Sequence, residues 1–248
     1  MFTVSCVVCV IDSDAEVVRG QIPGADIVAV PNAHAEVPEG PGFEQRTGFL
    51  FVGNFNHPPN ADAVAWWKRD IAPLLAETRP QTELTVIGND PMGTARELAG
   101  PGITVGGTVV STLPYLHQAR VSVAPLRYGA GMKSKVGEAL AAGIPVVLTS
   151  VAAEGMGLVH EEHVLIADTA DDFAAAVQRL YDDPELWERL RQAGAYPCGQ
   201  ALWPRSYEKR DLRHAGQPAG DSSSRSANGA FPRSLRKGPI RHELEATQ

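Results

Sequence analysis

The chain has 248 residues, of which 44% are hydrophobic and 21% charged, a balance that allows one large or two small domains with a real core. Its formal net charge of -7 disfavours a nucleic-acid partner, because a phosphate backbone demands a basic surface. No apolar stretch of about 18 residues occurs, and residues 1–11 lack the basic region and cleavage site of a signal peptide. We therefore expect a cytoplasmic protein, with a peripheral position on the inner membrane as the alternative.

The first part of the chain has the pattern of two strands and a helix. Residues 3–11 predict a buried strand, residues 14–20 a short helix and residues 26–30 a second strand. Cys6 and Cys9 form a C-x-x-C spacing in the first strand, but a zinc site would need a second ligand pair. We expect buried strand cysteines here and no metal site.

Strands and helices alternate through the next part. Residues 48–52 predict a strand, and Asn60 is expected to cap a helix that runs to about Thr78. Similar segments follow, with strands at 83–87, 103–105, 121–124, 145–148 and 164–167, and helices at 111–119, 132–142, 171–180 and 184–192. This alternation predicts an α/β fold, a Rossmann-like parallel sheet with helices on both faces.

Glycines gather where the predicted strands end, which is the edge at which such sheets bind ligands. They are Gly53, Gly88, Gly106, Gly107, Gly129 and Gly131. Each glycine alone is compatible with a tight turn, whereas their repetition at one edge favours a ligand site.

The segment 127–147 carries the most chemistry. A glycine loop follows a strand and opens a helix, so backbone N–H groups and the helix N-terminus can approach an anion closely. Lys133 and Lys135 add full charges in the same turn, which together suit a diphosphate. Glu138 lies on the same helical face as Lys135, and its carboxylate could accept hydrogen bonds from a ribose. The alternative is a surface Lys–Glu pair that contributes about 0.3–0.5 kcal/mol, and the residues alone leave both interpretations open.

Two common nucleotide motifs are absent from the sequence. Neither G-x-x-x-x-G-K-[ST] nor a G-x-G-x-x-G after the first strand occurs, which disfavours a Walker site and a nicotinamide dehydrogenase. The motifs that do occur resemble, in their order, the family-four retaining glycosyltransferases of the GT-B fold. The matching segments are 51–55 (FVGNF), 57–60 (HPPN), 121–131 (VSVAPLRYGAG), 133–138 (KSKVGE), 143–147 (GIPVV) and 153–156 (AEGM).

The resemblance implies a domain organisation. Residues 48–194 would be the carboxy-terminal, nucleotide-sugar-binding half of a GT-B fold, and residues 1–32 a remnant of the amino-terminal domain that ends in a hinge at Pro31-Asn32. Residues 33–47, polar and rich in Pro, Gly and Glu, are predicted to be a linker. Residues 195–248 lack apolar periodicity and are predicted to be a disordered or atypical tail.

The resemblance also implies roles for single residues. Glu138 matches the second acid of the family's E-x7-E motif and would hold the donor ribose, whereas the position of the first acid is Ala130. The expected donor site comprises Gly53, Gly131, Lys133 and Lys135 at the diphosphate, Gly106, Gly107 and Val109 at the base, and Gly129, Met132 and Glu154 near the donor sugar.

No catalytic residue follows from this comparison, and His57 is expected to have a structural role at the start of a helix. Retaining enzymes of this kind have no settled protein nucleophile, and the leaving diphosphate is thought to help deprotonate the acceptor. Neither a cofactor nor a metal is expected, because lysine and helix-dipole charge would stabilise the departing phosphate.

The leading hypothesis is a truncated retaining glycosyltransferase of the hexosyltransferase type. It would move a sugar from a nucleotide-diphospho-sugar to a glycan or lipid-linked acceptor, with a separate or fused domain binding the acceptor. The alternative is a non-catalytic nucleotide-sugar-binding or scaffold module, which Ala130 favours. A GT-B nucleotide-sugar epimerase is disfavoured, because it would need acid–base carboxylates on an intact second domain. The sequence determines neither base, sugar nor acceptor.

Overall fold

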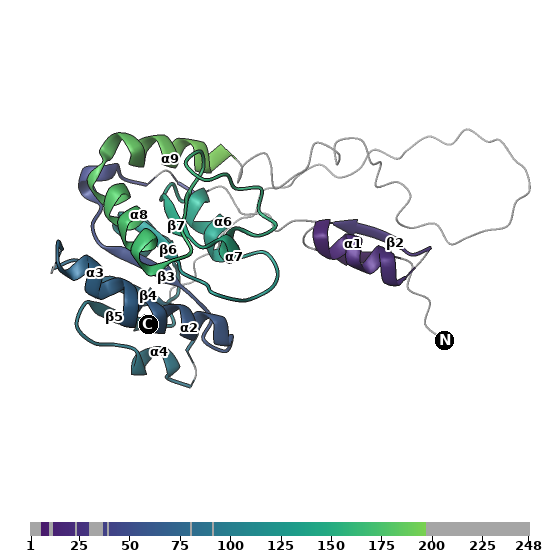
Figure 1. The fold of residues 1–248 in the computed structure, drawn as a ribbon, viewed down its shortest axis with the longest axis horizontal. Coiled ribbons are helices and arrows are strands. Elements are labelled where there is room, and N and C mark those ends of the chain that lie inside the picture. The colour runs from purple at the N-terminus through teal and green to yellow at the C-terminus, as the bar shows by residue number, and fades with distance from the viewer. Residues whose placement is uncertain are drawn as a thin grey trace, which may run out of the picture. The chain divides into compact units, whose positions relative to one another are not determined.

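The computed structural model describes residues 6–9, 12–22, 24–29, 37–38, 40–79, 81–90 and 92–196. These residues form a short amino-terminal unit and a larger α/β unit (Figure 1). The hinge expected at Pro31-Asn32 and the tail beyond residue 196 lie outside the described residues, so the predictions made for them stay predictions.

The amino-terminal unit is a single β-α-β element. Strand β1 (Cys6–Cys9) pairs in parallel with β2 (Asp26–Ala29), and helix α1 (Asp12–Gln21) connects them. Its small core is formed by Cys9, Ala15 and Ile27.

Only one of the two cysteines of this unit is buried. Cys9 lies in the core, whereas Cys6 is exposed, because residues three apart on a strand point to opposite faces. The expectation of two buried cysteines is therefore wrong for Cys6.

The larger unit is built on six parallel strands in the order β5-β4-β3-β6-β7-β8. These strands are β3 (Phe49–Val52), β4 (Leu84–Ile87), β5 (Ile103–Gly107), β6 (Val121–Ala124), β7 (Val146–Leu148) and β8 (Leu165–Ile166). The central strands β3, β6 and β7 are almost completely buried, as a sheet covered on both faces requires. The predicted Rossmann-like α/β fold is confirmed.

Helices cover both faces of this sheet, because right-handed crossovers in opposite directions leave the sheet on opposite sides. On one face, α2 (Pro58–Trp66), a π-helical turn (Trp67–Ile71) and α3 (Ala72–Ala76) pack against α8 (Ala170–Asp182). On the other face lie α5 (Leu113–Gln118), α6 (Ser134–Ala141) and α9 (Pro184–Tyr196). Short helices α4 (Thr94–Glu97) and α7 (Ser150–Ala153) follow β4 and β7.

Helix α2 begins earlier than the sequence predicts. Its first residue is Pro58 and its N-cap is His57, because proline has a fixed φ and lacks the N–H group that a first helical residue leaves unpaired. Asn60 is therefore inside the first turn and does not cap the helix. Its side chain is buried and available for another contact.

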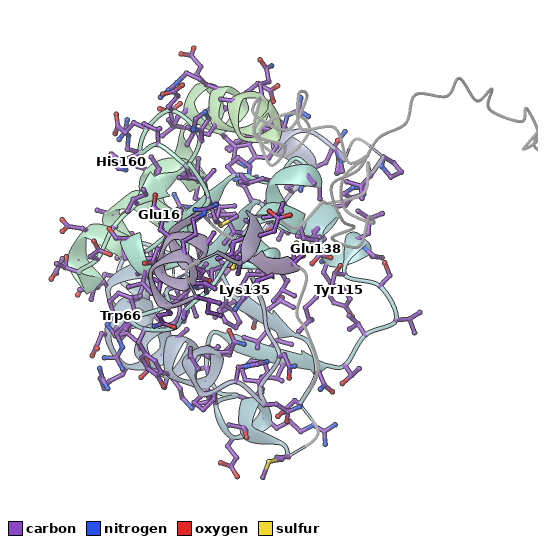
Figure 2. All side chains as sticks on the ribbon, turned by 90° about the vertical axis from the view of Figure 1, so that its right-hand side faces the viewer. Glu16, Trp66, Tyr115, Lys135, Glu138 and His160 are labelled. Carbon is purple, nitrogen blue, oxygen red and sulfur yellow. The ribbon has the colours of Figure 1, made fainter. Side chains whose placement is uncertain are left out.

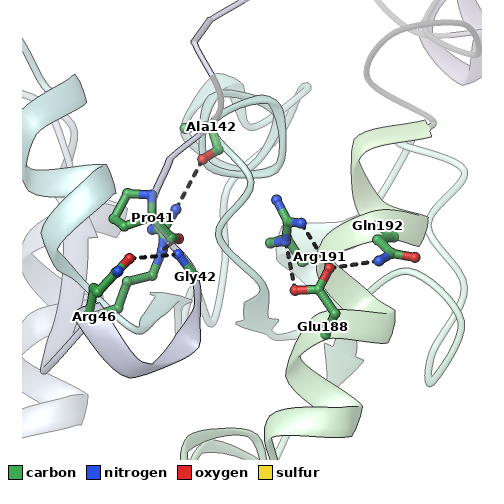
Figure 3. Close-up of polar contacts among 8 residues, drawn as sticks. Pro41, Gly42, Arg46, Ala142, Glu188, Arg191 and Gln192 are labelled. Carbon is green, nitrogen blue, oxygen red and sulfur yellow. Dashed lines mark hydrogen bonds and ion pairs between the residues drawn. The ribbon is translucent and has the colours of Figure 1, made fainter.

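A buried arginine fixes the segment that precedes β3 (Figure 3). Arg46 is 1% exposed and donates hydrogen bonds to the carbonyl oxygens of Pro41 at 2.7 Å, Ala119 at 3.2 Å and Ala142 at 3.4 Å. It also donates to the carbonyl of Leu116 in α5 and lies 5.4 Å from the ring centre of Trp187 in α9. Residues 40–47, expected to end a linker, are thus packed onto the folded unit.

No helix among the described residues combines the length and the apolar character that crossing a membrane requires.

Candidate functional site

The strand order creates a crevice between β3 and β6. From β3 the chain runs outward through β4 to β5 and then returns to add β6 on the other side of β3. The loops after β3 and β6 therefore leave the sheet in opposite directions, and open α/β sheets bind ligands at such a point. A cleft of about 440 Å³ lies there, lined by residues of both loops and by the first turns of α2 and α6.

The floor of this cleft depends on a close approach between two backbones. Gly53 follows β3, and its N–H donates to the carbonyl of Ile87 at 2.9 Å. A Cβ atom on Gly88 would lie 1.8 Å from the carbonyl oxygen of Gly53, and Gly88 has a φ of +132°. Only glycine fits this position without a clash.

Lys133 forms hydrogen bonds with the loop after β6, to whose end it belongs. Lys133 is the N-cap of α6 and is 8% exposed. Its ammonium donates to the carbonyl oxygen of Gly129 at 3.2 Å and to that of Gly131. Burial lowers the pKa of Lys133, while the nearby Glu154 carboxylate acts in the opposite direction. In this conformation Lys133 stabilises the glycine loop through its backbone carbonyls.

Lys135 lines the cleft, one helical turn before Glu138 (Figure 2). Its ammonium donates to Oδ1 of Asn60 and lies 4.4 Å from the ring centre of Phe51. Burial, and secondly the charge of Lys133, lower the pKa of Lys135 from 10.5 to about 7. An anion that entered the cleft would restore the proton, because an opposite charge favours the charged form.

Glu138 lines the same cleft as Lys135, so the prediction that both lie on one helical face is confirmed. Its Oε1 atom accepts a hydrogen bond from the hydroxyl group of Thr112, which precedes α5. This contact joins α6 to the loop that follows β5. The carboxylate is thus oriented by a neighbour and keeps oxygen lone pairs for a further donor.

Of the residues expected at the base, Gly106 and Gly107 end β5 and Val109 lies in the loop that follows it. Gly107 has a φ of +68°, and its carbonyl accepts from the N–H of Gly88 at 2.8 Å. Gly106 is exposed, and Val109 packs against the core. None of the three lines the cleft. The segment that contains them is connected to it by the hydrogen bond between Thr112 and Glu138.

The structure brings most of the expected donor-site residues together. Those that line the cleft are Gly53, Gly129, Met132, Lys133, Lys135 and Glu138. Gly131 belongs to the same loop, and Glu154 is exposed after α7. His57 and Ala130 also line the cleft.

Sequence reasoning missed Asn54, Asn60, Thr112 and Tyr128. Asn54 and Tyr128 line the cleft, and Asn60 and Thr112 hold its two main charged groups. The pair Pro58-Pro59 could have indicated the true helix start and hence an inward-facing Asn60. We see no signal in the sequence that would have pointed to Thr112.

The cleft brings together two lysine ammonium groups, the N-terminus of α6 and a carboxylate. Such a site can hold a phosphate group beside vicinal hydroxyls. Among the residues described, none of the acidic, histidine and cysteine side chains form a group of three that could hold a metal ion.

Solved structures with the same architecture are GT-B glycosyltransferases. A Staphylococcus aureus TarM variant in complex with fondaparinux, alpha-GlcNAc-glycerol and UDP matches with a TM-score of 0.67 and 12% identity, over 78% of this chain and 40% of that one. Sucrose-phosphate synthase from Thermosynechococcus elongatus matches with a TM-score of 0.59 and 20% identity, over 81% and 55%. The pneumococcal O-GlcNAc transferase GtfA in complex with UDP and GlcNAc matches with a TM-score of 0.61 and 16% identity, over 79% and 42%.

The family follows from the sequence itself. Residues 46–183 match the family described as "Glycosyl transferases group 1", and the chain belongs to it. A relative from Klebsiella pneumoniae, described as "Uncharacterized 44.6 kDa protein in cps region", is 30% identical over 134 residues, which are 50% of this chain and 34% of the relative. The chain thus spans about a third of that relative and roughly half of the solved structures.

Proposed function

We propose that the cleft between β3 and β6 binds a nucleotide-diphospho-sugar, and that the chain is the carboxy-terminal, donor-binding part of a retaining family-four glycosyltransferase. The observation that carries the proposal is the pair Lys135 and Glu138, which line one cleft at the strand switch point. A buried ammonium suits the diphosphate, and a carboxylate three residues further suits the ribose hydroxyls.

The donor would lie along the carboxyl edge of the sheet. Its diphosphate would meet the backbone of Gly53 and Gly131 and the charges of Lys133 and Lys135. Its ribose would meet Glu138, and its base would reach the loop of Gly106, Gly107 and Val109. The transferred sugar would lie toward Gly129, Met132 and Glu154, where Ala130 supplies no carboxylate.

The neighbours support uridine as the first base to test. The TarM and GtfA structures hold UDP, and the structure of Anabaena HepE is a complex with UDP and glucose. HepE matches this chain with a TM-score of 0.63 and 12% identity. We therefore propose a UDP-sugar as donor and a glycan or lipid-linked molecule as acceptor, with the acceptor-binding domain fused or separate.

In the proposed reaction the sugar leaves the diphosphate with retention of its anomeric configuration, as the resemblance to family-four enzymes implies. The buried ammonium of Lys135 and the N-terminus of α6 stabilise the negative charge that grows on the departing diphosphate. That diphosphate takes the proton of the acceptor hydroxyl. No cofactor or metal is part of this proposal.

The second candidate is a non-catalytic nucleotide-sugar-binding module. Ala130 favours it, because this exposed residue lines the cleft at the position of the family's first acid and cannot bond a sugar hydroxyl. The two candidates share the donor site and differ only in turnover.

The first experiment is titration calorimetry of the intact chain with UDP, GDP, ADP and CDP. We expect one nucleotide to bind, and Lys135→Ala to weaken it at least about tenfold, since a hydrogen bond to a charged group contributes about 1.5–3 kcal/mol. Lys68→Ala is the matched control, because the Lys68 ammonium is exposed and bonds the carbonyl of Ala99, away from the cleft. Absence of binding by all four, or equal affinities of wild type and Lys135→Ala, would overturn the donor site.

Turnover separates the two candidates. The chain is incubated with UDP-glucose, and released UDP is measured together with the anomer of glucose seen first by NMR. Early α-glucose supports the retaining enzyme, and early β-glucose contradicts retention. Binding without any UDP release, with or without added acceptors, favours the binding module.

A further inference from the structure

Asn60 has a buried polar side chain that does not cap helix α2. It lies in the first turn of α2, is 8% exposed, and its backbone N–H donates to the carbonyl of His57 at 3.0 Å. The side chain therefore has no capping role. A buried amide must still satisfy both its donor and its acceptor end.

The two ends of this amide contact opposite walls of the cleft. Nδ2 donates to the carbonyl oxygen of Asn54 at 2.7 Å, in the loop after β3. Oδ1 accepts from the ammonium of Lys135, on the helix after β6. The reverse orientation would set an NH₂ group against the ammonium and an oxygen against a carbonyl, so these partners fix a single orientation.

Gly53 leaves room for this amide. A Cβ atom at Gly53 would lie 3.2 Å from Cγ of Asn60 and 2.7 Å from Cε1 of Phe51, the ring that also faces Lys135. The side chains of Phe51 and Asn60 thus enclose the lysine from two directions. The position of the lysine is thus set by residues of β3 and α2, although the lysine itself belongs to α6.

The neutral character of Asn60 matters for the charge in the cleft. A carboxylate at this position would neutralise the ammonium and would repel a diphosphate, whereas an amide oxygen accepts the hydrogen bond without cancelling the charge. The other titratable groups that line the same cleft are His57, Tyr128, Lys133 and Glu138. Lys133 is the neighbour whose charge acts on Lys135.

We propose that Asn60 is a positioning residue that holds the Lys135 ammonium between the two walls of the cleft with a neutral acceptor, so that its charge stays available to the donor diphosphate. This inference rests on the proposed function, since it concerns the same site. It assigns a role to a residue that acts through Lys135.

The test is a double-mutant cycle on UDP affinity, measured by calorimetry with wild type, Asn60→Ala, Lys135→Ala and the double variant. We expect Asn60→Ala to weaken UDP binding about fivefold to tenfold, and to have no further effect in the Lys135→Ala background. Uridine, which lacks phosphates, should bind wild type and Asn60→Ala equally. Asn56→Ala is the matched control, because Asn56 is an exposed asparagine just before α2 that does not line the cleft.

A second variant covers the case in which Asn60→Ala fails to fold. Asn60→Asp keeps the shape and the acceptor but adds a negative charge. We expect weaker UDP-glucose binding and a shift to higher pH of the midpoint at which that binding declines. A purely structural role would leave the midpoint where it is in wild type.

Each outcome decides between the two proposals. The role of Asn60 is overturned by any one of three results: equal losses of affinity for UDP and uridine in Asn60→Ala, additive effects in the double variant, or an unshifted midpoint in Asn60→Asp. Each of these results leaves the donor site in place. A wild-type chain that binds none of the nucleotides overturns the donor site and the role of Asn60 with it.

Discussion

The carboxylate of Glu138 accepts a hydrogen bond from the hydroxyl group of Thr112, which ties helix α6 to the loop after β5. The residue proposed to bind ribose is therefore oriented by the loop proposed to receive the base. One rotamer of Glu138 is selected before any ligand arrives, and such preorganisation lowers the entropy that binding must overcome.

We predict that Thr112→Val, which keeps the shape of the side chain but not its hydroxyl, weakens UDP binding about fivefold, the equivalent of one ordinary hydrogen bond. Calorimetry with UDP and with 2′,3′-dideoxyuridine diphosphate checks this, because only UDP carries the vicinal hydroxyls. The dideoxy compound should bind both proteins equally. A loss of the same size for both ligands would contradict a role through the ribose.

Lys135 predicts a pH dependence of donor binding. Its pKa of about 7 means that the ligand-free lysine loses its proton as the pH rises through neutrality, and a bound diphosphate must restore it. We expect the affinity for UDP-glucose to be constant well below pH 7 and to fall by up to about tenfold per pH unit above it. Lys135→Arg, which stays charged, should remove this decline. Both proteins carry His57→Asn, which removes the imidazole from the cleft.

The stability of the ligand-free chain should change with pH in the opposite sense. Between pH 7 and pH 10.5 the unfolded lysine binds a proton that the folded Lys135 lacks. The contribution of this group to the free energy of unfolding therefore rises with pH across that window. Urea unfolding of wild type and Lys135→Met at pH 7 and pH 9 measures it. A difference between the two proteins that does not change with pH would contradict the lowered pKa.

The close contact at Gly88 predicts that one added methyl group has a large effect on the stability of the chain. Gly88→Ala should destabilise the chain by about 3 kcal/mol, because its Cβ would lie 1.8 Å from the carbonyl oxygen of Gly53. Gly102→Ala is the matched control, since Gly102 also has a positive φ of +73° but a Cβ there meets no heavy atom within 4 Å. Gly102→Ala should lower the free energy of unfolding by about 1 kcal/mol. Equal costs by urea unfolding would mean that the backbone conformation alone explains both.

Arg46 predicts that the segment before β3 contributes to stability. Arg46→Ala should lower the free energy of unfolding by about 3 kcal/mol, because it leaves several buried carbonyl groups without a donor. Arg46→Lys should recover only part of this, since an ammonium cannot reproduce the planar guanidinium fork. Arg69→Ala, at an exposed pair with Asp70, should change stability by at most about 0.5 kcal/mol. A loss no larger than that for Arg46→Ala would contradict the docked segment.

The sheet could be predicted from the sequence, because a strand that is buried on both faces consists of a short run of apolar residues. Helix boundaries were less accurate where two local preferences compete, as at Pro58 and Asn60, where the N1 preference of proline decided the outcome. The four-residue helices α4 and α7 were missed, because they are too short for a helical period to be recognised.

The candidate site was predictable only as far as it lies on one helix. Lys135 and Glu138 are three residues apart, so their common face follows from helix geometry. Their partners Asn60 and Thr112 lie 75 and 26 positions away, and no local pattern reports such contacts. The structural role of Arg46 was not predicted for the same reason. Arg46 lies in a polar stretch of sequence, and its hydrogen bond to Ala142 spans 96 positions.

The position of β3 at the centre of the sheet has a consequence for synthesis on the ribosome. Strands β4 and β5 emerge after β3 and can pair on one side of it, but its other side stays open until β6 has been translated. At that stage the cleft has a single wall, and Asn60 has no lysine to hold. A nucleotide that uses the proposed donor site would therefore not bind a nascent chain before α6 emerges, and would stabilise only molecules in which both halves of the sheet have joined.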